Sequence, residues 1–197
     1  MLVNYKNIID RELDKFCDEL PPLSIYEPIK YIVQLGGKRF RSSLTLLAAD
    51  LFCGKPELAL KESIAIELFH NFTLIHDDIM DGAPLRRSQP SVHQKWNVNQ
   101  AILSGDLLYA LVNKLLANSN SQSTEIHQLF QQTSVQVCEG QSLDMEFENK
   151  ENISLDEYIN MIQLKTSVLV ACGLKIGALV GEAGPKDANL LYDFGLN

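Results

Sequence analysis

The chain of 197 residues is 46% hydrophobic and 21% charged, a composition typical of a globular protein and not of a disordered one. Its formal net charge of -8 argues against a general grip on nucleic acid, because domains that bind nucleic acid are usually basic. The four cysteines are scattered singly, so neither a disulfide framework nor a zinc site is expected from them.

Apolar residues recur at helical spacing along almost the whole chain, which predicts an all-α fold. Helices are expected over residues 2–20, 25–33, 42–51, 57–81, 99–116, 124–147, 154–166, 168–180 and from 187 onward, with a polar loop over 118–123. Ser42 or Ser43 is a candidate cap of the third helix, and residues 154–157 fit a capping box. Because no strand alternation, repeat or linker is found, we expect one domain over residues 1–197.

The sequence also gives an expectation about membranes. The N-terminus mixes charged and apolar residues and does not resemble a signal peptide. The best membrane candidate, residues 168–180, is short for a bilayer and is interrupted by Lys175, so a buried helix is the better interpretation. We therefore expect a cytoplasmic protein without stable membrane insertion.

An acidic run, residues 77–81 (DDIMD), ends a long apolar helix and is soon followed by Arg86 and Arg87. Asp77 and Asp81 are four residues apart and project from one helix face, so both could hold Mg²⁺, a cation that prefers oxygen ligands. Asp78 lies about 100° away around the helix, where it could support the ligand shell or bind a second ion. Arginine forks match phosphate oxygens. The run could be a solvated helix end, but this context favours a site for a metal and a diphosphate.

A second cluster, residues 36–41 (GGKRFR), places cations at the start of a predicted helix, where anions are favoured. It lacks the P-loop pattern, and in isolation it could be an ordinary turn with solvated basic residues. His70 lies two helical turns before Asp77 on the same helix face.

Two further groups are less informative by themselves. Gln141 and Asp144 lie three residues apart on one helix face, and Lys165 with Thr166 supplies a cation and a hydroxyl together. Taken alone, each of these pairs is more simply read as ordinary helix surface.

In combination, these motifs resemble the all-α trans-isoprenyl diphosphate synthases, or polyprenyl synthetases. The order and spacing match from about Tyr31 to Thr166, through GGKRFR, His70, DDIMD, Leu85-Arg86-Arg87, GQSLDME and Lys165-Thr166-Ser167. The resemblance implies a helical bundle of the isoprenoid synthase type with a central active-site cavity. It also implies a transferase of the EC 2.5.1 type that uses Mg²⁺, with Mn²⁺ as a substitute, and forms a homodimer. Such an enzyme condenses isopentenyl diphosphate head to tail with an allylic diphosphate.

The resemblance also implies roles for particular residues. The metal site would comprise Asp77, Asp78 and Asp81. The allylic diphosphate would be bound by Arg86, Lys165, Gln141 and Asp144, and the residues implied to take part in catalysis are Asp77, Asp81, Arg86, Lys165 and Thr166. Isopentenyl diphosphate would be bound by Lys38, Arg41, His70 and Arg87. Arg39 occupies a motif position, but its role is open.

Product length would depend on Phe72 and Phe69, five and eight residues before Asp77, which could form a bulky floor under the growing chain. Both could also be simple core aromatics. Because the acidic motif has no two-residue insertion and Thr73 stands beside Phe72, we expect a short product of the C15–C20 class, farnesyl or geranylgeranyl diphosphate.

The sequence departs from the family pattern in one respect. Family members carry a second aspartate-rich motif on a later helix, and residues 1–197 contain none. We therefore expect them to form the N-terminal portion of an isoprenoid-synthase domain that is incomplete at its C-terminus, and the activity of this portion alone is left open. The alternatives are a non-catalytic subunit that binds isoprenyl diphosphates, or a class I terpene cyclase. A cyclase is disfavoured by the second phosphate-suited cluster at Lys38 and Arg41.

Overall fold

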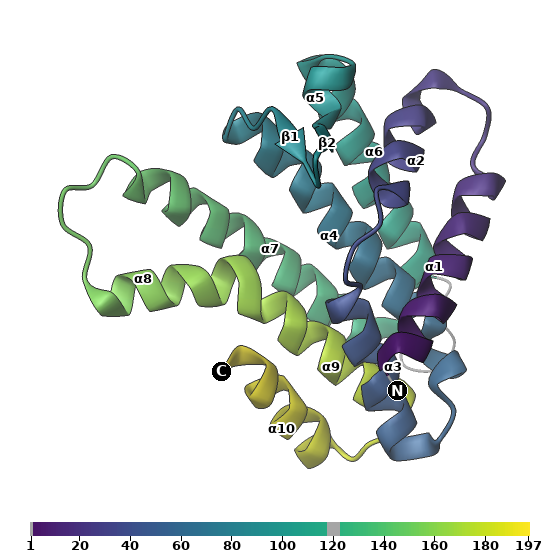
Figure 1. The fold of residues 1–197 in the computed structure, drawn as a ribbon. Coiled ribbons are helices and arrows are strands. Elements are labelled where there is room, and N and C mark those ends of the chain that lie inside the picture. Colours follow the sequence, from purple (N-terminus) through teal and green to yellow (C-terminus); the bar gives the residue numbers. More distant parts are fainter. Residues whose placement is uncertain (1, 118–122) are drawn as a thin grey trace. The chain divides into compact units, whose positions relative to one another are not determined.

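The computed structural model describes residues 2–117 and 123–197, and the predicted all-α class is confirmed (Figure 1). Helix accounts for 81% of the structure and strand for 2%. The chain forms two compact units, each described by itself below. Unit 1 comprises Met1–Ser43 and Ser63–Leu116, and unit 2 comprises Leu44–Glu62 and Ala117–Asn197. Most of the predicted polar loop over 118–123 lies outside the described residues.

Unit 1 contains the N-terminal helices and the helix that ends in the acidic run. Its elements are α1 (Leu2–Glu19), η1 (Ser24–Tyr26), α2 (Glu27–Gln34), the start of α3 (Phe40–Cys53), most of α4 (Leu60–Met80), β1 (Leu85–Arg86), β2 (Gln89–Pro90), α5 (Val92–Lys95) and α6 (Val98–Ala117). The predicted apolar stripe of α1 is buried through Tyr5, Ile9, Leu13 and Cys17. Helix α1 lies beside α2 (Figure 1). This packing follows from the helical spacing of the stripe.

A short hairpin that the sequence did not predict follows α4. Strands β1 and β2 are antiparallel, with Leu85 opposite Pro90 and Arg86 opposite Gln89. Each strand has two residues, too few to show an alternating pattern. The Tyr31 hydroxyl of α2 donates a hydrogen bond to the Pro90 carbonyl over 2.8 Å, which ties the hairpin to α2.

The predicted serine cap of α3 is wrong. The helix begins at Phe40, and the Ser43 N–H donates to the Arg39 carbonyl over 2.9 Å, so Arg39 occupies the N-cap position. Ser42 is buried, and its hydroxyl lies 2.9 Å from Oε2 of Glu67. The Ser42 side chain therefore bonds to Glu67 of α4 and does not cap the end of its own helix.

Unit 2 is built around one long helical run. Its elements are the rest of α3, η2 (Pro56–Ala59), α7 (Ser123–Phe147), α8 (Leu155–Ile162), the π-helical η3 (Gln163–Ser167), α9 (Val168–Val180) and α10 (Pro185–Leu196). The predicted capping box is confirmed, because Glu157 N–H donates to Ser154 Oγ and Ser154 N–H donates to Glu157 Oε2. Helix α10 lies beside α9 (Figure 1).

The two helices expected over 154–166 and 168–180 are in fact continuous. Residues Leu155–Val180 form one helical run of 26 residues that is long and apolar enough to cross a membrane. In its most apolar stretch, 56% of the residues are buried inside the protein, and a core helix of a soluble protein has the same properties. The run is therefore weak support for a membrane span. Gly177 lets α9 approach α3 closely, because a Cβ there would meet the Thr45 carbonyl.

Helix α9 ends in a Schellman motif with an unusual residue. The Ala183 N–H donates to the Ala178 carbonyl over 2.9 Å, and the Glu182 N–H donates to the Leu179 carbonyl over 3.0 Å. Glu182, the residue in the left-handed position, has a φ of 62°. Glycine is the usual residue there, because a Cβ is strained in this conformation.

We therefore predict that Glu182→Gly stabilises the protein by about 1 kcal/mol, since it relieves the strain of the left-handed conformation. The measurement is the free energy of unfolding from urea titration. Glu182→Gln is the matched control, because it removes the same charge and keeps the Cβ. Equal stability of the two variants would contradict the prediction.

Candidate functional site

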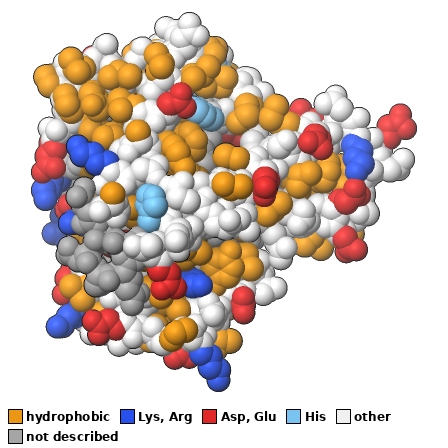
Figure 2. Space-filling view, turned by 180° about the vertical axis from the view of Figure 1, so that it is seen from behind, with side chains coloured by type: hydrophobic (Ala, Val, Ile, Leu, Met, Phe, Trp, Pro, Cys, Tyr) orange, Lys and Arg blue, Asp and Glu red, His pale blue; other side chains and the backbone are white. Residues whose placement is uncertain are grey.

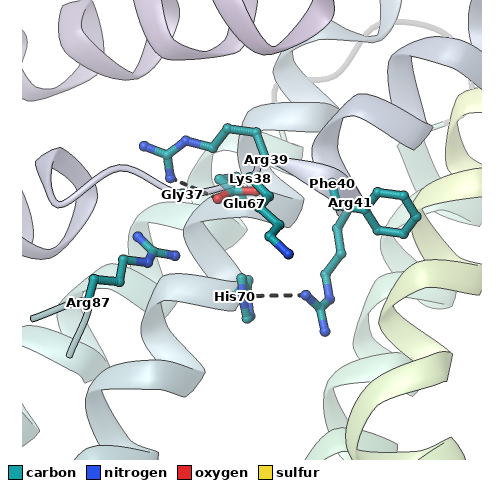
Figure 3. A pocket seen from close by; sticks show the side chains of 8 residues that line it. All are labelled: Gly37, Lys38, Arg39, Phe40, Arg41, Glu67, His70 and Arg87. Carbon is teal, nitrogen blue, oxygen red and sulfur yellow. Dashed lines mark hydrogen bonds and ion pairs between the residues drawn. The ribbon is translucent and has the colours of Figure 1, made fainter. Parts of the chain in front are cut away.

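A cationic pocket with a volume of about 660 Å³ lies within unit 1 (Figure 3). Its lining residues come from the α2–α3 connection, the start of α3, the middle of α4 and the hairpin turn, and are Gly37, Lys38, Arg39, Phe40, Arg41, Glu67, His70 and Arg87. All four residues that the resemblance implied for isopentenyl diphosphate are among them. The structure thus brings together side chains that are up to 49 positions apart, from Lys38 to Arg87.

Two strained backbone segments shape this pocket. Gly37 has a φ of 153°, a conformation that favours glycine, and a Cβ there would lie 2.8 Å from Nη2 of Arg87, so the guanidinium would have to shift. Arg87 and Ser88 form the two-residue hairpin loop with φ values of 53° and 63°, as in a type I′ turn. Such a turn usually contains Asn or Gly, and each residue with a Cβ in this conformation costs on the order of 1 kcal/mol. The turn therefore holds Arg87 at the pocket against a local preference.

The electrostatics of the pocket favour an anion. Burial, together with the nearby Arg41 and Arg87 cations, lowers the pKa of His70 to about 3, so its imidazole is neutral at neutral pH. Nε2 of His70 lies 3.5 Å from Nη1 of Arg41 (Figure 3). Burial also lowers the pKa of Arg41 and of Arg87, because both cations lose solvation. A phosphate group would restore the lost stabilisation of these cations.

The acidic run lies at the C-terminal end of α4, the helix whose middle lines the pocket. Helix α4 ends in a Schellman motif, in which Gly82 has a φ of 60° and the Ala83 N–H donates to the Asp78 carbonyl over 2.9 Å. The side chain of Asp77 is 21% exposed and Asp81 is exposed. Both carboxylates are therefore accessible to a ligand.

Asp78 differs from its two neighbours in the acidic run. Its carboxylate is fully buried and accepts hydrogen bonds from Nε and Nη2 of Arg86 over 3.0 and 2.5 Å. This bonding raises the pKa of Arg86. Nη2 of Arg86 also lies 3.9 Å from the Asp77 carboxylate. Asp78 therefore fixes Arg86 beside Asp77. Its expected role as a metal ligand stays a prediction.

The two accessible carboxylates fit the requirements of Mg²⁺. Within residues 2–117 and 123–197, no three His, Cys, Asp or Glu side chains gather as a complete metal site. Mg²⁺ does not need one, since it commonly combines one or two carboxylates with waters and substrate phosphates. Asp77 and Asp81, one turn apart at the end of α4, can supply the protein's share.

The remaining predicted residues lie in unit 2. Nζ of Lys165 lies 2.5 Å from Oδ2 of Asp144, and Lys165 belongs to the π-helical turn, a feature frequent at functional sites. Gly140 permits this contact between helices, because a Cβ there would collide with the Lys165 backbone. Nε2 of Gln141 is buried without a hydrogen-bond partner, and Thr166 is exposed.

The two expected floor residues pack against a third aromatic residue. Phe69 is fully buried, and its ring centre lies 5.5 Å from that of Phe72. Tyr109 of α6 lies 6.0 Å from Phe69 and 5.2 Å from Phe72. Sequence reasoning missed Tyr109, because nothing near it in the chain marks it. It also missed Glu67 of the pocket, which only its spacing of three residues from His70 could have indicated.

We predict that His70 stays neutral from pH 8 to pH 5, because protonation would add a cation to a buried cationic cluster. Its folded pKa lies below its unfolded value, so His70 makes stability fall as pH drops from about 6.5 toward 3. Histidine ¹⁵N NMR checks the protonation state, with His70→Gln to assign the signal. Saturating inorganic diphosphate should raise this pKa. Protonation of His70 near pH 6.5 in the free protein would contradict the prediction.

Comparisons with known proteins give consistent results. The polyprenyl synthetase family model matches residues 22–197. The chain is 38% identical over 195 residues to a geranylgeranyl diphosphate synthase of Methanosarcina mazei, covering 98% of this chain and 60% of that protein. It is 36% identical over 197 residues to a short chain isoprenyl diphosphate synthase of Methanothermobacter thermautotrophicus, covering 99% of this chain and 61% of that protein. A crystal structure of a geranylgeranyl pyrophosphate synthase matches with a TM-score of 0.95 and 41% identity, over 100% of this chain and 60% of that chain.

The chain spans about three fifths of the length of these relatives. The match to the solved geranylgeranyl pyrophosphate synthase structure confirms the predicted isoprenoid synthase fold. The family model covers the cationic pocket, the acidic run and the Asp144–Lys165 pair together. The chain belongs to the polyprenyl synthetase family.

Proposed function

We propose that the protein is a Mg²⁺-dependent prenyltransferase. It condenses isopentenyl diphosphate head to tail with an allylic diphosphate and releases diphosphate. The observation that carries this proposal is the cationic pocket, which lies two helical turns along α4 from the acidic run. His70 and Asp77 are seven residues apart, or about 10 Å along a helix axis. One helix thus presents two phosphate-suited sites at a separation suited to two diphosphates.

The pocket is proposed to bind isopentenyl diphosphate. Lys38, Arg41 and Arg87 supply the charge, and the two guanidinium groups can each donate paired hydrogen bonds to phosphate oxygens. The neutral imidazole of His70 can donate one more hydrogen bond without adding to the repulsion among the cations. This arrangement orients the substrate so that its double bond can attack the allylic carbon.

The allylic diphosphate is proposed to bind at the end of α4. Asp77 and Asp81 would hold Mg²⁺, with Mn²⁺ as a substitute, and Asp78 would support the site through Arg86. When bound, the metal would neutralise charge on the departing diphosphate. Arg86, fixed by Asp78, would donate hydrogen bonds to the same leaving group.

Residues of unit 2 are proposed to complete the recognition of the allylic substrate. Lys165 would bind its diphosphate, and Asp144 would orient Lys165 through their ion pair. The unsatisfied amide of Gln141 has a donor available for a ligand oxygen. Thr166 is proposed to lie near the developing carbocation.

The proposed product is a C15–C20 prenyl diphosphate. Phe72 and Phe69 would form the floor that stops chain growth, and the packing of Tyr109 against both rings supports a rigid barrier. The names of the Methanosarcina and Methanothermobacter relatives agree with a short product.

We further propose a cytoplasmic homodimer, without stable membrane insertion. Exposed apolar side chains of α6 include Val98, Ile102 and Leu103, which are suited to a protein contact. Figure 2 shows hydrophobic side chains gathered toward the upper left of the face seen from behind, while charged ones lie mainly nearer its edges.

The test of this function is a product assay. We predict that the full-length protein, given Mg²⁺, labelled isopentenyl diphosphate and an allylic primer, forms C15–C20 diphosphates and releases diphosphate. Chromatography of the dephosphorylated products gives their length. A dominance of chains longer than C20 would refute the short product, and an absence of turnover would refute the prenyltransferase.

We predict that Asp81→Asn lowers kcat by about a hundredfold or more, because it removes a carboxylate that holds the metal at the leaving group. Asp14→Asn, which makes the same change in charge at an exposed position of α1, should leave kcat unchanged. Steady-state diphosphate release measures both, with circular dichroism to check the fold. Equal activity of the two variants would rule out the proposed role of Asp81.

A further inference from the structure

Arg39 differs from the other cations of the GGKRFR motif in its burial and its hydrogen bonds. Arg39 stands between Lys38 and Arg41, yet it is only 4% exposed and has a φ of 50°. Figure 3 shows its guanidinium directed away from His70 and Arg41. Its three nitrogens all donate to protein acceptors: Nε to Asp10 over 2.9 Å, Nη1 to Glu67 over 2.8 Å and Nη2 to the Val33 carbonyl over 2.9 Å. Three of its five N–H groups are therefore already bonded within the protein, and its side chain is buried.

Glu67 is the centre of this buried network. Its Oε1 accepts from Arg39, and its Oε2 lies 2.9 Å from the hydroxyl of Ser42 on the first turn of α3. The Asn71 amide donates to the Glu67 carbonyl over 2.7 Å, one turn further along α4. The Ser63 hydroxyl donates to the Ser42 carbonyl over 3.0 Å. The network therefore fastens the start of α3 to α4 at the level of the pocket.

The network also reaches the first two helices. Asp10 belongs to α1, where Lys6 is its second partner, and Val33 belongs to α2. One guanidinium thus connects α1, α2 and α4 to the N-cap of α3. Lys38, directly before it, and Arg41, two residues after it, line the pocket together with His70.

We infer that Arg39 and Glu67 are positioning residues, which hold Lys38 and Arg41 in register with His70 so that the pocket is preorganised for a diphosphate. They contact no ligand and act through the pocket cations. The inference rests on the proposed function, since it takes the pocket to be a diphosphate site. It also assigns the motif position whose role the sequence left open.

The negative charge of Glu67 makes it possible to distinguish an effect of charge from an effect of position. A carboxylate that lines an anion pocket opposes anion binding through its charge. If charge alone mattered, Glu67→Gln would tighten diphosphate binding, and Arg39→Lys would leave it unchanged. If position matters, both variants weaken binding. The amide of the Glu67→Gln variant lacks the charge that holds Arg39, and a single ammonium cannot bond Asp10, Glu67 and the Val33 carbonyl as the guanidinium does.

The experiment measures the affinity of the full-length protein for inorganic diphosphate by calorimetry. Metal-free buffer with EDTA is used, so that the aspartates of the acidic run cannot bind it through a metal. We expect Glu67→Gln and Arg39→Lys each to raise Kd about tenfold, and Arg41→Gln to raise it at least as much. Asp14→Asn is the control for the loss of one negative charge. Circular dichroism and an unfolding curve confirm that each variant is folded at the temperature used.

A double-mutant cycle separates positioning from general destabilisation. Because Arg39 and Glu67 act through Arg41 and its neighbours, Glu67→Gln should cost clearly less in the Arg41→Gln background. The inference is overturned if Arg41→Gln weakens binding while Glu67→Gln and Arg39→Lys bind as tightly as the wild type. It is also overturned if the cost of Glu67→Gln is the same in both backgrounds. If Arg41→Gln itself has no effect, the proposed diphosphate pocket fails instead.

Discussion

Repulsion among cations is the constraint on which the site in unit 1 depends. Two clusters of the sequence place Lys38, Arg39, Arg41, Arg86 and Arg87 close to one another, and their mutual repulsion opposes folding. Two buried carboxylates reduce this repulsion, because Glu67 forms an ion pair with Arg39 and Asp78 forms one with Arg86. The other three cations, Lys38, Arg41 and Arg87, line the pocket. An ion pair that loses one partner leaves a buried charge uncompensated, so these carboxylates are as necessary as the cations.

Helix α4 sets the spacing between the two chemistries. Its middle carries Glu67 and His70, and its end carries Asp77, Asp78 and Asp81. Because a helix is stiff and rises by about 1.5 Å per residue, the distance along α4 between the pocket and the acidic run is fixed. A condensation between two diphosphates benefits from such a fixed spacing, since the reacting atoms must be held in one geometry.

Backbone strain is concentrated where the cations are presented. Arg39 and Arg87 both adopt a left-handed conformation that residues with a Cβ rarely take. Arg39 is held in this conformation by its three hydrogen bonds. Arg87 is held by the register of the hairpin, and its guanidinium lies against Gly37, which has no Cβ to displace it. Strain of this kind persists only when the surroundings over-determine it, and it is often found where side chains must be aimed.

The sequence by itself determined the helical class, most helix boundaries and four members of the pocket, Lys38, Arg41, His70 and Arg87, because these depend on local periodicity and on motifs with fixed spacing. Only the tertiary structure decided which of the charged residues face a ligand and which neutralise one another. Helix geometry already placed Asp78 on a different face from Asp77, but only the packing shows that Asp78 is fully buried against Arg86. The sequence misassigned Ser42 as a cap, because the competing partner, Glu67, lies 25 residues away along the chain. Pairing over such separations follows from how helices pack, and a linear pattern carries no record of it.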